Sequence, residues 1–307
     1  MAHPILRPLA RIYHCIQKQY YIFLHKYFPK LLIEIKFKHY LGYKLDWSNP
    51  VDINEKINWL KIYSDTTMWS LLADKYAVRE YVASKGFCDF LVPLIGKWDS
   101  TDDIKWDELP MKFVMKMNNG SGDILVCKNK TAIDIQHWRK RFKSLFSMPF
   151  GYVMGEPHYD IIKPCIIAEE LLDCTKQPIE TSSLIDYKIW CFNGKPYSIW
   201  ACFNRTSSSV QVASYDLDWV KRPEHSVSTS RYILSDITLP RPKSLDRMLE
   251  AASKLSEGFP EVRIDFYEVD NHPYFGEMTF TSNAGYMEFY TKKYLVELGK
   301  QVVLPRK

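Results

Sequence analysis

The feature that most constrains the fold is a pair of apolar runs near the carboxyl end, interrupted once by a turn. Residues 261–267 and 274–280 both read as strands, and Asp270-Asn271-His272-Pro273 lies between them. Two such runs joined by turn residues predict an antiparallel hairpin. After Glu261, which begins the first run, the apolar pattern is interrupted by the charged residues Arg263, Asp265 and Glu277.

The two acids of this hairpin are the strongest functional signal in the chain. Side chains opposite each other on paired strands come within about 5 Å. Two carboxylates that close repel each other unless a cation lies between them, and Mg²⁺ is bound by one or two carboxylates. Arg263 is two residues before Asp265, so we expect both on one face of their strand. The alternative is a pair of exposed acids on an edge hairpin.

A second hairpin is predicted around a glycine-rich turn. Residues 113–117 and 124–127 are apolar, and Asn118 to Asp123 between them contains Gly120 and Gly122. Lys116 comes just before this turn, where backbone N–H groups can point at phosphate oxygens and the lysine adds a charge. An ordinary hairpin turn would give the same pattern.

Further elements follow from spacing alone. We expect helices at residues 54–63, 71–84, 133–146 and 245–257, a buried strand at 166–168, and a hairpin from 187–192 to 197–203. Glu169 and Glu170 end the buried strand. They could form a hinge between lobes that contacts a nucleotide, or they could simply be a solvated strand end. Antiparallel pairs mixed with helices predict an α+β fold of two lobes, with the region 46–110 mostly helix and loop.

The basic charge is confined to the amino-terminal segment. The net charge is +5, and residues 1–40 hold seven Lys or Arg and one acid, which leaves a net charge of −1 for the remainder. A nucleic-acid-binding surface is therefore not expected. Apolar residues recur at helical spacing in residues 1–35, without a run long enough to span a bilayer. This segment either packs on the protein's own body or lies on an anionic membrane.

Longer motifs resemble the TupA-like branch of the ATP-grasp superfamily, over roughly residues 36–290. The stretches that carry the likeness are Asn54-Glu55-Lys56-Ile57-Asn58-Trp59-Leu60-Lys61, Ala73-Asp74-Lys75-Tyr76-Ala77-Val78-Arg79-Glu80-Tyr81-Val82, Glu156-Pro157-His158-Tyr159, Asp186-Tyr187-Lys188-Ile189-Trp190-Cys191-Phe192-Asn193-Gly194-Lys195 and Tyr215-Asp216-Leu217-Asp218-Trp219. The resemblance implies an ATP-grasp fold, with two α+β lobes clasping ATP and a helical amino-terminal extension. We expect the segments 1–45 (basic amphipathic extension), 46–110 (helical region), 111–172 (small lobe) and 173–307 (large lobe with the metal site).

The resemblance also implies roles for individual residues. Nucleotide binding would fall to Lys75, Lys116, Ser121, Gly122, Glu169, Glu170, Leu171, Leu172 and Asp186. Mg²⁺ would be held by Asp265, Glu277 and Thr279, where Thr279 stands at a position that is Asn in many relatives, and Asn283 is a further candidate. The catalytic residues would be Arg263, Lys188 and Arg205. Lys188 replaces an arginine of the amino-acid ligases in the superfamily, so the positive charge is kept without the two-pronged hydrogen bonding.

The function expected from this resemblance is ATP- and Mg²⁺-dependent ligation of a carboxylate to an amine through an acyl phosphate. The substrates would be a sugar acid or amino acid, free or on a lipid-linked saccharide, in the synthesis of a capsular or O-antigen polysaccharide. The expected place is the cytoplasm, with peripheral contact to the inner face of the membrane. Alternatives are a glycosyltransferase of the same process and a non-catalytic nucleotide-binding scaffold. The seven scattered cysteines favour reduced thiols.

Overall fold

Two β-sheets organise the computed structural model, which describes residues 6–122, 124–148 and 150–305, with the side chains of residues 6–15 left out. The larger sheet has the strand order β10-β9-β5-β6-β7-β8 and the smaller one the order β1-β4-β2-β3. All neighbours are antiparallel except β7 and β8. The strands are β1 (Leu94–Trp98), β2 (Phe113–Met117), β3 (Leu125–Cys127), β4 (Ile166–Glu169), β5 (Asp186–Phe192), β6 (Lys195–Phe203), β7 (Val210–Tyr215), β8 (Tyr232–Leu234), β9 (Val262–Val269) and β10 (His272–Thr279).

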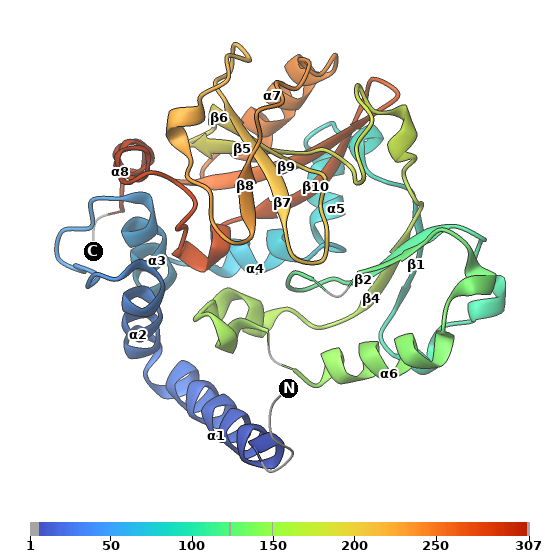
Figure 1. Ribbon diagram of the computed structural model, residues 1–307, viewed down its shortest axis with the longest axis horizontal. Helices are drawn as coiled ribbons and strands as arrows, with labels where there is room; N and C mark the ends of the chain where they lie inside the picture. The colour runs from blue at the N-terminus through green and yellow to red at the C-terminus, as the bar shows by residue number, and fades with distance from the viewer. Residues whose placement is uncertain (1–5, 123, 149, 306–307) are drawn as a thin grey trace.

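The helices surround these sheets (Figure 1). Helix α7 packs on β5, β6, β9 and β10, while α3 and α8 pack on each other beside the large sheet. Helix α6 covers the small sheet, whose own core includes Phe142. The α-helices are α1 (Leu6–Tyr27), α2 (Pro29–Leu41), α3 (Ile53–Tyr63), α4 (Thr67–Ala73), α5 (Val78–Ser84), α6 (Ile135–Phe146), α7 (Leu245–Leu255) and α8 (Lys292–Gln301).

The structure confirms the mixed α+β architecture and each predicted hairpin. The predicted turn of the last hairpin is shorter than expected, because only Asp270 and Asn271 connect β9 to β10, both with positive φ. Such two-residue turns match the twist of paired strands. Strands β1, β7 and β8 were not expected. β1 pairs with β4, so the small sheet includes a strand from the region 46–110, for which the sequence predicts mostly helix and loop.

The helix predicted over residues 71–84 is wrong as a single element. The structure has two short helices, α4 and α5, with a turn between them. The carboxylate of Asp74 accepts hydrogen bonds from the backbone N–H groups of Tyr76 and Ala77. An aspartate that binds nearby backbone in this way competes with the helix. The break places Lys75, one of the four residues between the two helices, within reach of Gly120 and Glu277.

The amino-terminal segment consists mostly of the helices α1 and α2, with Phe28 between them and residues 42–45 outside them. Residues 1–5 of the predicted segment 1–45 lie outside the described residues. In the described part of the chain, none of the helices combines the length and hydrophobicity needed to cross a bilayer. The six cysteines with described side chains are free thiols, and the side chain of Cys15 lies outside the described set.

Candidate active site

The carboxylates of the last hairpin meet because of a bulge in β10. The pairing register shifts between Phe275 and Glu277, so Phe275 lies opposite Phe266 while Glu277 lies opposite Asp265. In a regular ladder without this bulge, Gly276 would lie opposite Asp265, and Glu277 would share the face of Phe275. A Cβ atom at Gly276 would lie 3.0 Å from the Asp265 carbonyl oxygen. Glycine thus allows the close backbone approach that turns Glu277 toward Asp265.

Asp265 is the centre of a buried ion-pair network. Arg263 donates from Nε to Oδ1 at 2.7 Å and from a terminal nitrogen to Oδ2 at 2.8 Å. Lys188, opposite Asp265 on β5, also bonds Oδ2. The Lys188 ammonium further contacts Asp186 at 2.6 Å, and Arg205 contacts Asp186 at 3.7 Å. The structure therefore brings together Arg263, Lys188, Arg205, Asp186 and Asp265.

The cation that separates the two hairpin acids is an arginine. The same Arg263 nitrogen that bonds Asp265 lies 3.7 Å from Oε1 of Glu277. Burial by itself would lower the pKa of Arg263, but Asp265 and Glu277 raise it overall. The proximity of the two acids therefore does not require a metal ion, which removes the electrostatic argument made from the sequence.

Glu277 is the more open carboxylate. Its side chain is 33% exposed, against 2% for Asp265, and Lys75 lies 3.4 Å from Oε2. Burial would raise the pKa of Glu277, but the positive charges of Lys75, Lys188, Arg263 and Lys116 outweigh it and lower the pKa to about 2. Glu277 is thus ionised at neutral pH and faces cations from several segments of the chain.

A second, separate ion-pair group joins the small sheet to helix α5. Lys116 on β2 contacts Oε2 of Glu169 at 2.7 Å, and Arg79 on α5 contacts Oε1 at 3.0 Å. Asn118 joins the following loop to the Asp74 turn, because its Nδ2 donates to Asp74 at 2.8 Å. Arg79 and Asn118 were not predicted as site residues, and only their place in or beside the motifs could have indicated them.

The glycine-rich loop is tied to the rest of the site by Lys75. Its ammonium donates to the Gly120 carbonyl at 2.6 Å, and its backbone N–H donates to the Asn118 carbonyl at 2.9 Å. Ser121 and Gly122 in this loop are exposed, as is Glu170 after β4, while Leu171 and Leu172 are half-buried. No contact between these five residues and the Asp265 network is among the described interactions. Their nucleotide-binding roles stay predictions.

The oxygen donors predicted for a metal lie close together but are partly engaged. Thr279 Oγ1 accepts from Arg263 at 3.2 Å and donates to Glu277 at 3.4 Å. Asn283 instead donates to the Tyr286 carbonyl at 2.7 Å. Among the described residues, no group of three or more His, Cys, Asp or Glu side chains is arranged to hold a metal. The donors present are hard oxygens, which fit Mg²⁺ completed by phosphates and water.

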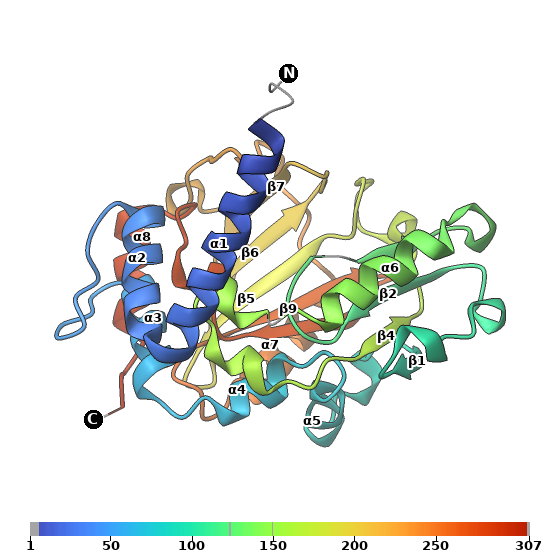
Figure 2. The ribbon, with the colours of Figure 1, turned by 90° about the horizontal axis from the view of Figure 1, so that it is seen from below.

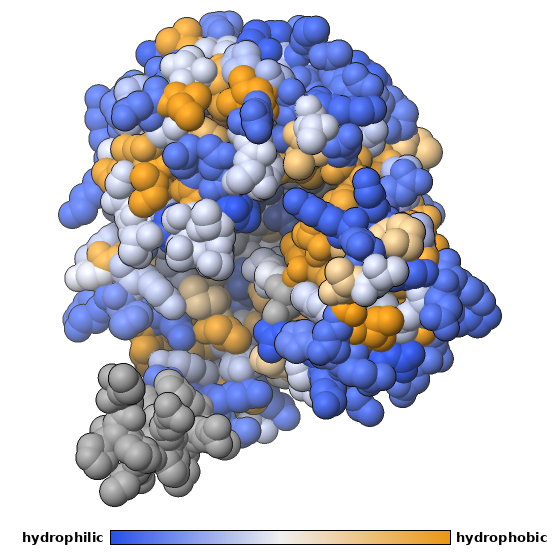
Figure 3. All heavy atoms as spheres, turned by 45° about the vertical axis from the view of Figure 1, so that its right-hand side comes forward, coloured by the Kyte–Doolittle hydropathy of each residue, from blue (hydrophilic) through white to orange (hydrophobic). Residues whose placement is uncertain are grey.

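The surface is hollowed between the upper part of the molecule and the part at lower right, and hydrophilic side chains lie in the hollow (Figure 3). Lys75, Lys116, Arg79, Arg263, Lys188 and Arg205 supply six cations to the two groups, against four carboxylates. An excess of cations suits a polyanionic ligand.

A family model described as TupA-like ATPgrasp matches residues 55–303, which is most of the chain. The chain belongs to the TupA-like ATP-grasp family. No curated protein matches it.

Solved structures similar to this TupA-like protein include ATP-grasp ligases. D-alanine–D-alanine ligase from Bacillus anthracis is 14% identical with a TM-score of 0.45, covering 79% of this chain and 73% of that one. The complex of that ligase with ATP is 14% identical with a TM-score of 0.37, and the match covers 68% of this chain and 55% of the ligase. The chain therefore spans about half of that ligase. D-Alanine-D-alanine ligase from Helicobacter pylori is 14% identical with a TM-score of 0.41, and the match covers 82% of this chain and 69% of that one.

In this TupA-like protein, the motif on α3 has a structural role that the sequence did not indicate. Asn58 donates to the Gly285 carbonyl at 2.9 Å, and Lys61 donates to the Ala284 carbonyl at 2.8 Å. Asn283, Ala284 and Gly285 all have positive φ, a conformation that is costly for the two residues with a Cβ. The neighbouring Ser282 accepts from Arg263 at 2.8 Å. Helix α3 therefore holds the strained turn that contacts Arg263.

Buried titratable groups lie behind this turn. Burial lowers the pKa of Lys61 to about 7, and the charge of Glu156 opposes that shift. Burial raises the pKa of Glu156, which accepts from Thr281 at 2.6 Å. Burial also lowers the pKa of His158 to about 3, and neither ring nitrogen bonds any described residue. These groups come from the predicted motifs, but nothing in the sequence showed that they would meet.

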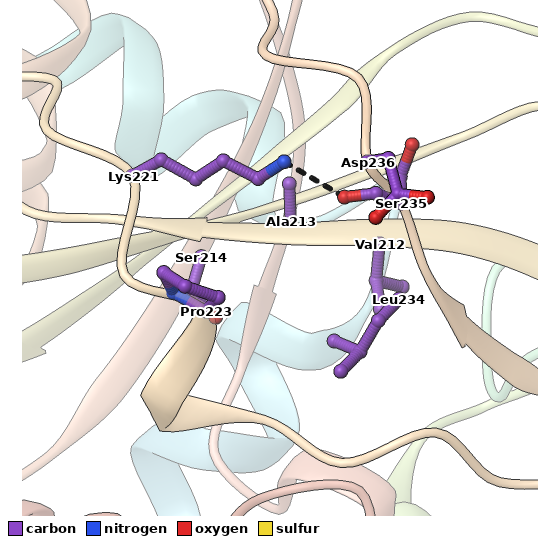
Figure 4. Close-up of a pocket in the computed structure, with 8 residues that line it drawn as sticks. All are labelled: Val212, Ala213, Ser214, Lys221, Pro223, Leu234, Ser235 and Asp236. Carbon is purple, nitrogen blue, oxygen red and sulfur yellow. Dashed lines mark hydrogen bonds between the residues drawn. The ribbon is translucent and has the colours of Figure 1, made fainter.

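A separate pocket of about 280 Å³ lies between β7, β8 and the segment around Lys221. Lys221 reaches across it to the Ser235 carbonyl at 2.8 Å (Figure 4). The pocket is lined by none of the candidate site residues. It therefore plays no part in the site described above.

Proposed function

We propose that this protein is an ATP- and Mg²⁺-dependent ligase that joins a carboxylate to an amine through an acyl phosphate. The observation that carries the proposal is the positive electrostatic field around Glu277. The charges of Lys75, Lys188, Arg263 and Lys116 lower the pKa of this carboxyl group. These cations come from the helical region, the small sheet and the large sheet of a chain that belongs to an ATP-grasp family. Cations that converge in this way can stabilise the negative charge of phosphates.

The proposed reaction has two steps. A carboxylate oxygen attacks the γ-phosphorus of ATP, the bond to the β-phosphate bridging oxygen breaks, and ADP leaves. The amine nitrogen then attacks the acyl carbon, the carbon–oxygen bond to phosphate breaks, and the amine proton passes to solvent. Lys75 and Lys116 would neutralise the phosphates, and Arg263 would stabilise the negative charge that develops on the oxygen of the tetrahedral intermediate. Lys188 and Arg205 would position the carboxylate substrate.

Glu277 is the residue best placed to hold Mg²⁺, because its contacts of 3.4 and 3.7 Å leave room for another partner. Asp265 and Thr279 complete the proposed set. A ligand bond from Asp265 would replace a contact with Arg263 or Lys188. The metal would supply neutralisation of phosphate charge during transfer.

The substrate proposed is a sugar acid or amino acid, either free or carried on a lipid-linked saccharide, in the synthesis of a cell-surface polysaccharide. Peripheral membrane contact through residues 1–35, on the cytoplasmic face, belongs to the same proposal. The support is the TupA-like family assignment together with the basic amino-terminal segment.

The test is to measure the nucleotide released and the mass of the product with a panel of amino acids, uronic acids and amines. ADP, phosphate and an amide product are expected, and Lys116→Ala should strongly reduce their formation. Lys112→Ala, an exposed lysine just before β2, serves as the matched control. Release of UDP from a nucleotide sugar would instead establish a glycosyltransferase, and AMP would exclude the acyl phosphate route.

A further inference from the structure

Helix α1 has two different faces in the structure. One face packs on the protein's own body: Leu24 is buried, His25 lies 2.5 Å from Asp160, and the helix contacts α2 and the short helix at Gly151–Val153. Of the two alternatives left open by the sequence, packing on the protein's own body is therefore observed for this face of the helix.

The other face carries an apolar stripe that no described residue covers. Ile16, Tyr20, Phe23 and Tyr27 are 65%, 49%, 50% and 57% exposed, and their spacing of four, three and four residues places them on one side of the helix. Phe28 and Leu31, also exposed, extend the stripe into α2. Aromatic rings make up most of it, and Phe23 lies 5.2 Å from Tyr27. A continuous exposed patch of this kind marks an interaction surface.

The charges on the two helices that carry the stripe are mostly positive. The ammonium of the exposed Lys26 lies 5.2 Å from the centre of the Tyr27 ring, Lys18 and Lys30 are exposed on the same two helices, and Glu34 is the one acidic residue between positions 16 and 40. Glu34 is itself engaged, since the Trp47 indole donates to it at 2.6 Å. Lysines flanking aromatic residues match the interface of an anionic bilayer, where the rings enter the headgroup region and the ammonium groups attract acidic lipids.

A second basic helix lies on the same side of the molecule. Helix α6 contains Arg139, Lys140, Arg141 and Lys143 and no acidic residue. Its apolar face, which includes Phe142, is buried in the small lobe, while Lys140 and Lys143 are exposed. Seen from below, α1 and α6 both lie toward the viewer, and β5 and β9 are seen between them (Figure 2). Those two strands carry Lys188 and Asp265.

We propose that the face formed by the α1 stripe and the basic side of α6 docks on an anionic lipid bilayer, so that the side on which β5 and β9 are seen between the two helices is turned toward the membrane. This deepens and rests on the proposed action on a lipid-linked substrate, although the docking itself requires no catalysis. A second copy of the chain is a poorer occupant, because two such faces would bring like charges together.

The test uses the full-length protein in flotation with vesicles of phosphatidylcholine alone or with phosphatidylglycerol added. Wild type should bind the anionic vesicles and not the neutral ones. Phe23→Ser with Tyr27→Ser should reduce binding more than about tenfold, and Lys140→Glu with Lys143→Glu should do so most strongly at low salt. Val220→Ser with Ile237→Ser, an exposed apolar pair elsewhere, should bind like wild type.

Equal binding to both vesicle types, or no loss in the variants, would overturn the proposal. Dimerisation of wild type in sedimentation, lost in the Phe23 and Tyr27 variant, would instead assign the stripe to a second copy. Because flotation needs neither ATP nor turnover, a failed ligase assay leaves this result unaffected. Conversely, ADP release with a soluble substrate should be unchanged in all of these variants, which alter only exposed residues.

Discussion

At the scale of single residues, the environment of Asp265 reverses an expectation drawn from the sequence. From the sequence we expected two carboxylates that repel each other unless a cation lies between them, so that neutralising one would leave stability unchanged or raise it. In the structure, Asp265 accepts two hydrogen bonds from Arg263 and one from Lys188 while almost fully buried. Removing one member of a buried pair leaves the partner charges uncompensated, which costs about 3–5 kcal/mol.

We therefore expect Asp265→Asn to lower the free energy of unfolding by about 2–4 kcal/mol, since the amide retains one acceptor oxygen. Turnover should fall further than nucleotide affinity, because Arg263 loses the partner that orients it. Urea unfolding and ADP release against Mg²⁺ concentration measure the two effects. Glu277→Gln is the comparison: it should disturb the Mg²⁺ dependence with a smaller loss of stability. Identical Mg²⁺ curves for both variants and wild type would place the metal elsewhere.

His158 predicts a specific dependence of stability on pH. Its pKa is about 3 in the folded protein, because burial disfavours the charged ring, against 6.5 in an unfolded chain. Below pH 6.5 the unfolded chain gains a proton that the folded chain does not, so stability is lost as the pH falls from 6.5 toward 3. His158→Phe removes that group. The variant should lose less stability than wild type in urea titrations between pH 6.5 and 4.5, by an amount on the order of 2–3 kcal/mol. Parallel pH profiles would show that His158 does not titrate in this way.

At the scale of elements, α3 is a support for the site. Two lysines on this helix each donate to a backbone carbonyl at 2.8 Å: Lys61 to Ala284 in the strained turn, and Lys56 to Val302 near the carboxyl end. They form a comparable pair, because the bond is the same and the segment held differs, although Lys61 is buried and Lys56 is half-buried.

We expect Lys61→Met and Lys56→Met each to destabilise the fold by about 1–3 kcal/mol, the cost of leaving a buried acceptor without its partner. Only Lys61→Met should also lower kcat, because the turn it releases contacts Arg263 through Ser282. Steady-state kinetics at saturating ATP make the comparison. An equal loss of kcat in both variants would show that α3 supports the fold as a whole and has no specific effect on Arg263.

At the scale of the whole molecule, Lys75 joins three parts of the chain. It lies between α4 and α5, donates to Gly120 in the loop after β2, and contacts Glu277 on β10. Lys75→Ala and Lys116→Ala should each weaken ATP binding by about 1.5–3 kcal/mol, the usual value of a hydrogen bond to a charged group. Lys112→Ala should bind ATP like wild type. Calorimetry with Mg-ATP measures all three, and unchanged affinity in both site variants would remove the phosphate assignment.

The sequence by itself determined the family, the hairpins and the residue types of the site, because periodicity and motif order are local properties of the chain. Asp265 and Glu277 were recognised as charges in apolar strands, and Lys116 as a lysine before a glycine-rich turn. The roles assigned to these residues remain proposals.

Only the tertiary structure decided which groups meet. The bulge at Gly276 turns Glu277 toward Asp265, and Arg263 rather than a metal separates the two acids. The contacts of Lys61 with Ala284 and of Lys116 with Glu169 join residues 223 and 53 positions apart. Likewise, the division of α1 into a packed face and an exposed aromatic face depends on what lies next to it. Such pairings depend on strand register, because a shift of one residue turns every side chain of a strand to the other face. They also depend on close packing between segments that are distant in the chain. A local sequence pattern records neither property.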